Sequence, residues 1–377
     1  MIYLDNAATT KPCRAAVEAM IESAQKFANP SSLYGIGLDA EKAINDARGA
    51  IARAIGALSK NIYFTSGGTE ANNMVILGAA EAMKRYGTHV ITTKIEHPSV
   101  LEAFSRLEQN GYRVTYLTPD KDGRISIDEL KSAADEETTL ISVMHVNNET
   151  GVIQPVEEIR DAIRDIAPKA LIHSDCVQSF GKIPVNARKM NVDFITVSAH
   201  KIHGFKGCGA AFVNDTRKIR PLILGGGQQD GIRPGTENAG GIMAFGAAVR
   251  EMKPEPEKLN ALRLLLKEEL TKTLDNIKFN GSDEYNSGSV LNVSVLGVRA
   301  EILLHSLEAR GVYVSTGSAC STHKPEPSHV LTAMGLNKKE IDGAIRLSFS
   351  RDTTADEVKT AAQIIAEEAA NIRRIMR

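Results

Sequence analysis

The stretch FITVSAHKIHGFKG, residues 194–207, joins a run of β-forming residues to a lysine, Lys201, with a histidine close on each side. The run 194–200 predicts a buried strand that ends just before the lysine. Lysine is almost never fully buried, so the ordinary interpretation of Lys201 is a solvated side chain on a loop. The alternative is a nucleophilic amine of the kind that forms Schiff bases with aldehydes. This one residue does not decide between them.

The strand at 194–200 is one of several short, β-branched and mostly apolar stretches. The others are HVITTKI (89–95), RVTYLTP (113–119), TLISVMHV (139–146), ALIHSD (170–175) and GAAFV (209–213). Strands that are apolar on both faces require cover on both sides. Helical patterns lie between most of them, for example from Thr69 and from Val156. We therefore predict an α/β fold with a mainly parallel sheet wrapped by helices.

The pattern changes after about residue 255. A long amphipathic helix is predicted from PEPEKLNALRLLLKEELTKTL, which begins at Pro254. Short strands, one further helix and a terminal helix through ADEVKTAAQIIAEEAANIRRI follow it. This order predicts a second, smaller α+β domain.

The composition is that of an ordinary globular protein. The 377 residues are 42% hydrophobic and 24% charged, and 45 Lys and Arg against 46 Asp and Glu leave a formal charge of -1. That balance gives no global reason to expect binding to nucleic acid or to an anionic membrane. The N-terminus lacks a basic segment followed by an apolar one, and no apolar run approaches the roughly 18 residues of a spanning helix. We expect a cytoplasmic protein with no membrane contact.

The four cysteines, Cys13, Cys176, Cys208 and Cys320, show no C-x-x-C spacing. This pattern fits neither a disulfide framework nor a zinc knuckle. A cysteine with a special role here is therefore expected to have it through its reactivity.

Polar residues follow several of the predicted strands, where ligands of open α/β sheets bind. A glycine-rich turn, TSGGTE (65–70), leads into a helix whose free N–H groups can hold a phosphate. The other strand ends carry His97, Asn147, Asn148, Asp175 and Gln178. Each of these has an ordinary interpretation as a turn or helix cap. Together they indicate a site.

Pyridoxal phosphate accounts for an amine, a phosphate seat and a carboxylate at once. Its aldehyde condenses with a lysine, its phosphate needs N–H and hydroxyl donors, and its pyridinium nitrogen needs an acidic partner. A nicotinamide cofactor would not need the lysine. A zinc site from His200, His203 and Cys208 is the metal alternative, but the spacing does not obviously bring these three together.

Eight motifs occur in the order, and with about the spacing, found in NifS/IscS-type cysteine desulfurases. They are YLDNAATT, TSGGTEANN, EHPSVLE, HVNNETG, HSDCVQSFGK, SAHKIHGFKG, GGGQQDGIRPGTEN and STGSACST. The chain thus resembles this family, within the class V aminotransferase group of fold type I pyridoxal-phosphate enzymes, over nearly its whole length. The resemblance implies a large domain with a mainly parallel sheet of the seven-stranded type and a smaller α+β domain.

Three parts of the chain are expected on this basis. Residues 1–12 form an N-terminal segment that associates with the small domain, and 13–255 form the large domain that binds pyridoxal phosphate. Residues 256–377 form the small domain that carries the cysteine loop.

The resemblance also implies roles for individual residues. Lys201 is the Schiff-base lysine, Asp175 the partner of the pyridine nitrogen, and Gln178 the donor to the phenolic oxygen of the ring. His97 stacks on the ring and can shuttle protons. Asn148, rather than Asn147, lies near the ring and the substrate carboxylate.

Further positions match the residues that bind phosphate and carboxylate. The phosphate positions are Gly68, Thr69, Ser198 and His200. Thr236 matches a residue that reaches the phosphate of the neighbouring subunit, which implies a homodimer with shared sites. Arg346 matches the arginine that binds the substrate carboxylate, a role suited to its bidentate fork.

Cys320 lies in STGSACSTHKPEPS (315–328), whose small, polar, Gly- and Pro-containing composition predicts an exposed loop. A cysteine is more often a small buried hydrophobe, but this setting favours a reactive thiol. With an ordinary pKa of about 8.5 the thiol needs help to ionise. His323 and Lys324 are near enough in sequence to give it. The segment matches the long-loop branch of the family, in which the cysteine travels between cofactor and acceptor.

The predicted reaction converts L-cysteine to L-alanine and leaves the sulfur as a persulfide on Cys320. A sulfur-acceptor protein, in iron–sulfur cluster assembly or tRNA thiolation, then receives it. The chain ends after EEAANIRRIMR, so we expect it to lack the C-terminal extension that helps one branch to dock the iron–sulfur scaffold. The acceptor therefore stays open.

Two alternatives remain at this point. One is a related enzyme of the same fold, a selenocysteine lyase or a small-molecule aminotransferase, although an aminotransferase would not need Cys320. The other is a non-catalytic scaffold, which would have no reason to keep Lys201, Asp175, His97, Cys320 and Arg346 together.

Overall fold

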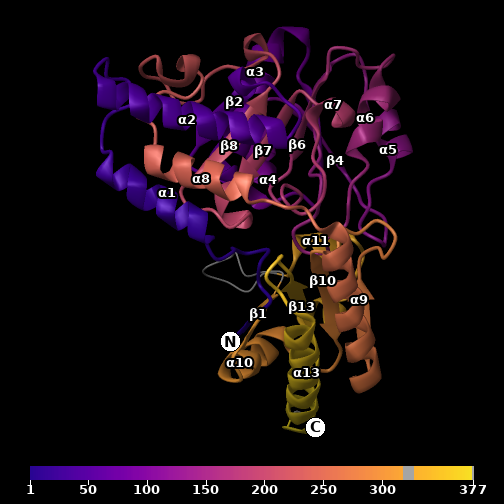
Figure 1. Ribbon diagram of the computed structural model, residues 1–377. Coiled ribbons are helices and arrows are strands. Elements are labelled where there is room, and N and C mark those ends of the chain that lie inside the picture. Colours follow the sequence, from indigo (N-terminus) through magenta and orange to yellow (C-terminus); the bar gives the residue numbers. More distant parts are fainter. Residues whose placement is uncertain (317–326, 376–377) are drawn as a thin grey trace.

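A seven-stranded sheet forms the centre of the larger part of the molecule (Figure 1). The computed structural model describes residues 1–316 and 327–375. The strand order is β2-β8-β7-β6-β5-β3-β4. The bounds are β2 (Ile62–Thr65), β3 (His89–Thr93), β4 (Arg113–Leu117), β5 (Thr138–Ser142), β6 (Leu171–Asp175), β7 (Phe194–Ser198) and β8 (Gly209–Val213).

The sheet is mainly parallel, which confirms the predicted fold class. The neighbours from β7 through β4 are parallel, whereas β8 is antiparallel to both β7 and β2. The antiparallel β8 follows from its short connection, since a parallel crossover would need a dozen or more residues between β7 and β8. The strand β2 was not among the predicted strands.

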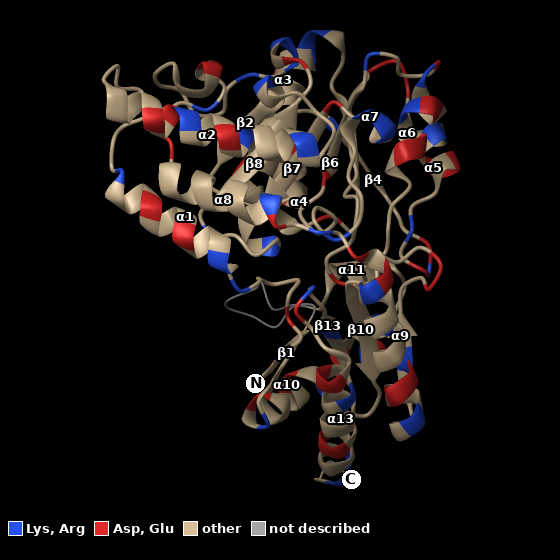
Figure 2. Cartoon of the chain, in the orientation of Figure 1, with Lys and Arg blue, Asp and Glu red and all other residues tan. Residues whose placement is uncertain are grey.

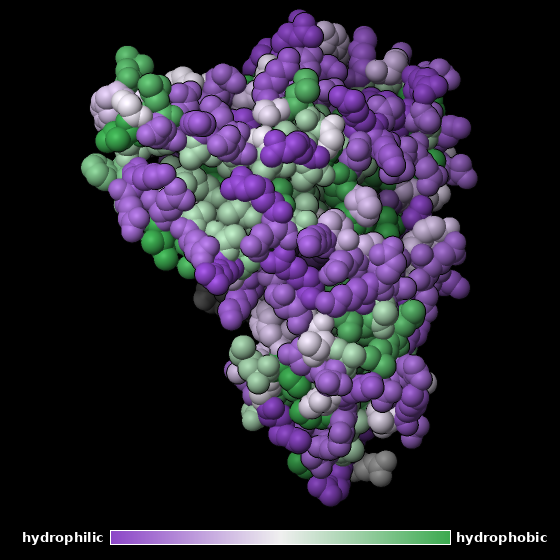
Figure 3. Space-filling model, viewed as in Figure 1, coloured by the Kyte–Doolittle hydropathy of each residue, from purple (hydrophilic) through white to green (hydrophobic). Residues whose placement is uncertain are grey.

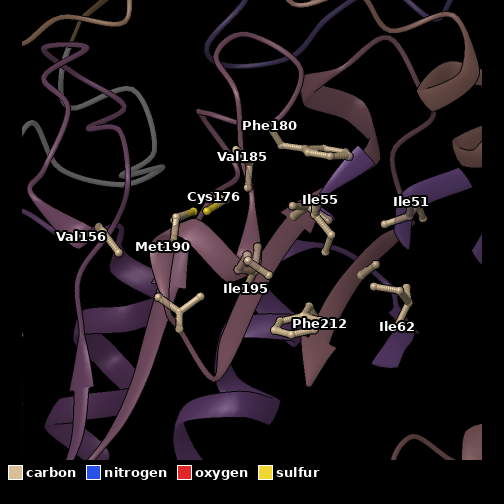
Figure 4. Close-up of a cluster of buried hydrophobic side chains, with 14 of the residues drawn as sticks. Ile51, Ile55, Ile62, Val156, Cys176, Phe180, Val185, Met190, Ile195 and Phe212 are labelled. Carbon is tan, nitrogen blue, oxygen red and sulfur yellow. The ribbon is translucent and has the colours of Figure 1, made fainter. Parts of the chain in front are cut away.

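Helices cover both faces of this sheet, and neighbouring strand residues alternate between two cores. Ile172 and Ile195 belong to the core beneath α2 (Gly35–Ala54) and α8 (Ala239–Arg250). Figure 4 shows side chains from this core, including Ile51 and Ile55 of α2. Leu171 and Phe194 instead pack with α3 and α4 on the opposite face. This alternation explains why β5, β6, β7 and β8 are buried at every position. The remaining helices of the larger part are α1 (Arg14–Gln25), α3 (Gly68–Met83), α4 (Pro98–Gln109), α5 (Ile127–Ala133), α6 (Val156–Ile163) and α7 (Ala187–Met190).

The smaller part is built on a four-stranded antiparallel sheet of order β12-β13-β10-β9. Its strands are β9 (Ile277–Asn280), β10 (Val290–Val295), β12 (Ser315–Thr316) and β13 (Ala344–Ser348). Strand β11 (Val312–Tyr313) precedes β12 in the chain but is not part of this sheet. Its helices are α9 (Pro256–Thr273), α10 (Ala300–Ala309), α11 (His329–Ala333), α12 (Lys338–Asp342) and α13 (Ala355–Ile375). In Figure 1 this part lies below the larger sheet, with α9 and α13 side by side.

The N-terminal residues connect the two parts. Strand β1 (Ile2–Tyr3) pairs in parallel with β11, and Leu4 is buried in the core of the smaller part. Asn6 donates a hydrogen bond from Nδ2 to the carbonyl of Ser348 at 2.9 Å. The chain then crosses to the larger part, where Thr10 N–H donates to the carbonyl of His200 at 2.9 Å. The boundaries 1–12, 13–255 and 256–377 stay predictions.

Acidic and basic residues are interspersed along both parts of the chain in the cartoon of Figure 2. Among the described residues, no helix combines the length and the apolar composition that crossing a bilayer requires.

Candidate functional site

A cavity of about 260 Å³ lies beyond the carboxyl ends of the parallel strands. Its lining includes most of the residues predicted to form the site. These are Gly68, Thr69, His97, Asn148, Asp175, Gln178, Ser198, His200 and Lys201. Residues far apart in sequence therefore converge because they lie at, or shortly after, the ends of β2, β3, β5, β6 and β7.

Lys201 enters the cavity directly after β7. Its Nζ atom donates to the carbonyls of Ala7 and Ala8, at 2.6 and 2.7 Å. These two acceptors belong to the N-terminal segment that crosses from the smaller part. The ordinary interpretation of Lys201 as a solvated loop residue is therefore not what the structure contains.

The glycine-rich turn brings backbone N–H groups to one side of the cavity. Helix α3 begins at Gly68, the second glycine of this turn. At Gly209, the first residue of β8, an added Cβ would lie 2.6 Å from the carbonyl carbon of Gly67, so only glycine allows this close approach. The free N–H groups and the positive end of a 16-residue helix suit a phosphate.

Ser198 and His200 lie on the same side of the cavity as this helix start. An added Cβ at Gly68 would lie 3.7 Å from the Ser198 Cβ, which places the two residues in contact. Burial, with the charge of Lys201 as the next cause, lowers the pKa of His200 to about 4. His200 is therefore neutral at pH 7, and its Nδ1 lies 3.1 Å from Thr9 Oγ1.

Asp175 lines the cavity, and its carboxylate accepts two hydrogen bonds. Its Oδ1 accepts from Val177 N–H at 2.9 Å, and its Oδ2 accepts from Asn72 Nδ2 at 2.7 Å. The same Nδ2 of Asn72 donates to Ser99 Oγ at 2.9 Å. Ser99 Oγ lies 2.8 Å from His97 Nδ1. A continuous network thus joins the carboxylate of Asp175 to the imidazole of His97.

Asn72 was not among the predicted site residues, although it lies within the motif TSGGTEANN. It is buried and also accepts a hydrogen bond from Thr196 Oγ1 at its Oδ1. The missed signal is spacing, because Asn72 follows Gly68 by four residues and so lies on the same face of α3.

His97 caps α4, and the cap fixes its tautomer. Its Nδ1 accepts from the backbone N–H of Ser99 at 3.2 Å, so the proton of the neutral ring lies on Nε2. Burial is the largest cause that lowers the pKa of His97, and the positive charge of Lys201 adds to it. The ring is therefore neutral near pH 7 and can both give and take a proton.

Arg346, from β13 of the smaller part, lies beside the cavity rather than in its lining. Its guanidinium donates to the carbonyl of Asn148 at 3.1 Å and pairs with the Asp5 carboxylate at 2.9 Å. Its Nε is buried without a hydrogen-bond partner. An unsatisfied buried N–H next to a fork of donors is a position that a carboxylate would satisfy.

Two further predicted site residues are not among those that line the cavity in the described part of the chain. Thr236 is exposed and does not line the cavity. Cys320 lies outside the described residues, but the residues that flank the segment 317–326 are described. Ser315 is the β-ladder partner of Arg346, and Ser328 donates from Oγ to the Glu149 carboxylate at 2.5 Å. One flank thus lies beside Arg346, and the other contacts Glu149, the residue that follows Asn148 in the chain.

The other three cysteines are buried and free. Burial raises the pKa of Cys176 and of Cys208 to about 12 each, and it also raises the pKa of Cys13. Figure 4 shows Cys176 inside the core, among Val185 and Met190. Across residues 1–316 and 327–375, no three His, Cys, Asp or Glu side chains are grouped as metal ligands would be, and this includes His200, His203 and Cys208.

Comparison with known proteins gives consistent matches over nearly the whole chain. The family model for class-V aminotransferases matches residues 2–360. A cysteine desulfurase IscS of Methanosarcina thermophila is 42% identical over 376 residues, covering 99% of this chain and 93% of the relative.

Solved structures give the same picture. A NifS-like protein superimposes with a TM-score of 0.90 at 36% identity, covering 97% of this chain and 98% of that one. A structure described as SspA in complex with cysteine superimposes with a TM-score of 0.83 at 35% identity, covering 93% of this chain and 99% of that one.

The Asn72 network generates a stability prediction. Asn72→Leu should lower the free energy of unfolding by about 2 kcal/mol, because the buried Asp175 carboxylate and the buried Thr196 hydroxyl each lose a hydrogen bond. Asn73→Leu is the matched control, since its two donated bonds go to backbone carbonyls nearer the surface. Urea unfolding of the protein measures both. Equal losses in the two variants would contradict the network.

Proposed function

The chain belongs to the class-V aminotransferase family, in its branch of IscS- and NifS-like cysteine desulfurases, and we propose the following reaction and residue roles. It removes sulfur from L-cysteine, releases L-alanine and retains the sulfur as a persulfide on Cys320. The observation that carries the proposal is the convergence of Lys201, Asp175 and His97 on one cavity, with Arg346 beside it.

The donor set of the cavity fits pyridoxal 5'-phosphate. Lys201 would hold its aldehyde carbon, and Asp175 would accept a hydrogen bond from its ring nitrogen. Gln178 would donate to its ring oxygen, and His97 would stack on its ring. Its phosphate would be bound by Gly68, Thr69, Ser198 and His200, which lie together at the N-terminus of α3. When bound, this group supplies a carbonyl that condenses with amines and a ring that withdraws electrons from the substrate Cα.

Substrate binding is assigned to Arg346 and Asn148. The unpartnered Nε of Arg346 and its adjacent N–H groups form a fork for the cysteine carboxylate. Asp5 occupies one arm of that fork and would be displaced by the substrate. The exchange replaces one carboxylate by another, so Arg346 keeps a negative partner throughout.

Proton transfer is assigned to Lys201 and His97. Lys201 removes the Cα proton of the substrate as a general base, a role open to its amine only in the neutral form. The neutral His97 moves a proton at the substrate sulfur, and Ser99 and Asn72 hold its ring in place.

Sulfur transfer is assigned to Cys320. Its Sγ forms a bond to the substrate sulfur while the Cβ–S bond of the substrate breaks, and the electron pair of that bond stays with the three-carbon product. Only four peptide units separate Cys320 from Thr316, the last residue of β12, which pairs with β13. Four peptide units span at most about 15 Å. Cys13, Cys176 and Cys208 are buried, with raised pKa values, and are poor nucleophiles.

A homodimer with shared sites is part of the proposal. The connection from α1 to α2 and the first turn of α2 expose several large apolar side chains, Phe27 at 84%, Leu33 at 92%, Tyr34 at 58% and Ile36 at 56%. Figure 3 shows apolar surface at this end of the molecule. The same connection and the loop that precedes Thr236 line one open groove. A second copy covering this groove would bring Thr236 towards the phosphate of its partner.

The acceptor of the sulfur is proposed to be a protein thiol, either of an iron–sulfur scaffold or of a tRNA-thiolation enzyme. The cytoplasm is the proposed location. A reducing compartment suits free cysteines and an exchangeable persulfide.

Lys201→Ala should abolish the reaction. Alanine release from L-cysteine should fall by more than about a hundredfold, since the variant loses a general base and the amine that holds the cofactor. Lys189→Ala, an exposed lysine on α7, is the control and should keep full activity. Alanine release from Lys201→Ala at the wild-type rate would remove this lysine from the mechanism.

Cys320→Ser separates cofactor chemistry from sulfur transfer. The variant should bind pyridoxal phosphate and change its visible spectrum with cysteine, because those steps use Lys201, Asp175 and Arg346. Mass spectrometry should find the wild type about 32 Da heavier on the peptide that contains Cys320, and should find no persulfide on the variant. A persulfide on Cys13, Cys176 or Cys208 would assign the nucleophile elsewhere.

The dimer is tested at its apolar surface. Phe27→Asp combined with Leu33→Asp should convert a dimer to a monomer in sedimentation velocity. The cofactor should bind about tenfold more weakly, as expected for one lost hydrogen bond to a charged group. Ile302→Asp, a partly exposed apolar residue of α10, is the control. An unchanged sedimentation coefficient would exclude this surface.

A further inference from the structure

Lys182 is a buried lysine to which the reaction above assigns no role. It lies seven residues after Asp175, the last residue of β6, and 7% of its surface is exposed. Its Nζ donates to Gln178 Oε1 at 2.7 Å. Across the described residues it forms no ion pair. The charges that affect its pKa are those of Lys201 and Arg346, which are also positive.

Burying an amine among cations is costly. Burial is the main cause that lowers the pKa of Lys182 to about 7, and the charges of Lys201 and Arg346 lower it further. Lys182 in turn lowers the pKa of His200 and of His203. A side chain with an unfavourable environment and one specific contact suggests that the contact has a function.

The contact fixes the orientation of the Gln178 side-chain amide. The protonated lysine amine has only hydrogen-bond donors and no acceptor, so the atom of the amide that faces Lys182 is Oε1. The Nε2 of Gln178 then faces the other way and donates to the carbonyl of Ala7 at 3.0 Å. That carbonyl also accepts from Lys201 Nζ at 2.6 Å.

The opposite orientation of the amide would lose both hydrogen bonds. It would place the NH2 group of Gln178 against the amine of Lys182 and its oxygen against the carbonyl of Ala7. Two favourable contacts would become two repulsive ones, so the orientation is determined at both ends. Since Gln178 lines the cavity, this orientation decides whether an N–H or a lone pair faces a bound group.

We propose that Lys182 is a positioning residue, whose amine holds the Gln178 amide with its NH2 group directed towards Lys201 and the cavity. The amide can then only donate a hydrogen bond to a bound group. This inference rests on the proposed function, in which that group is the ring oxygen of pyridoxal phosphate.

A double-mutant cycle tests whether Lys182 acts through Gln178. The four proteins are the wild type, Lys182→Met, Gln178→Ala and the double variant, each as the holoenzyme. Two quantities are measured, the dissociation constant of pyridoxal phosphate from the visible absorption and kcat/KM for L-cysteine.

The expected result is a strong dependence on background. In the native background, Lys182→Met should lower cofactor affinity and kcat/KM about tenfold each, as for one lost orienting hydrogen bond. In the Gln178→Ala background it should lower either by less than about twofold, because the amide it positions is gone. Lys253→Met, an exposed lysine that lines the same small pocket as Lys182, should change neither.

Equal factors in the two backgrounds would overturn the proposal, since a structural role would weaken both equally. No effect of Lys182→Met in the native background would overturn it as well. The variant should fold, because it removes a buried amine that has no carboxylate partner within residues 1–316 and 327–375. Should it not fold, Lys182→Gln keeps a donor on a shorter side chain and replaces it in the cycle, with a smaller loss expected.

The proposed function fails separately, through different measurements. If the wild type releases no alanine from cysteine, the desulfurase assignment is wrong, and the cofactor-affinity cycle still tests Lys182. If alanine is released but the cycle is additive, only the role of Lys182 is wrong.

Discussion

The hydrogen bonds from Lys201 to the carbonyls of Ala7 and Ala8 are the contacts on which the site depends. A part-buried amine needs hydrogen-bond acceptors, and these two backbone carbonyls provide them. These carbonyls are themselves positioned by the smaller part, through the β1 and β11 pairing and through Asn6. The geometry of the lysine thus requires both parts of the chain, although only one of them carries it.

Positive charge accumulates around this lysine. Burial lowers the pKa of Lys182, and the positive charges of Lys201 and Arg346 lower it further. Such a cluster is unfavourable in isolation, but a phosphate and a substrate carboxylate would both relieve it. Binding of anionic groups is therefore built into the charge distribution of the site.

Much of this arrangement could be predicted from sequence because it follows from local patterns. Each predicted strand was confirmed, since β-branched runs between helical patterns leave little choice. The convergence of Asp175, His97 and Lys201 followed from their places at strand ends. By contrast, β2 is four residues long and gave no distinct pattern, and it forms an edge strand through pairing with β8.

Asn72 and Lys182 could not be identified in the same way. Each acts through another residue, Asn72 on Asp175 and Lys182 on Gln178. Sequence shows which residues can perform chemistry, but contacts that orient them depend on side-chain packing. The helical spacing of Asn72 from Gly68 was available as a signal, whereas the burial of Lys182 was not, because lysine is ordinarily exposed.

The central claim is that the amine of Lys201 is the one that binds the cofactor. Reduction of the holoenzyme with borohydride would convert an imine to a stable secondary amine, and peptide mass spectrometry would locate it. The account predicts a pyridoxyl group on Lys201 and on no other lysine. A pyridoxyl group on Lys182, or none on any lysine of a protein that binds pyridoxal phosphate, would contradict it.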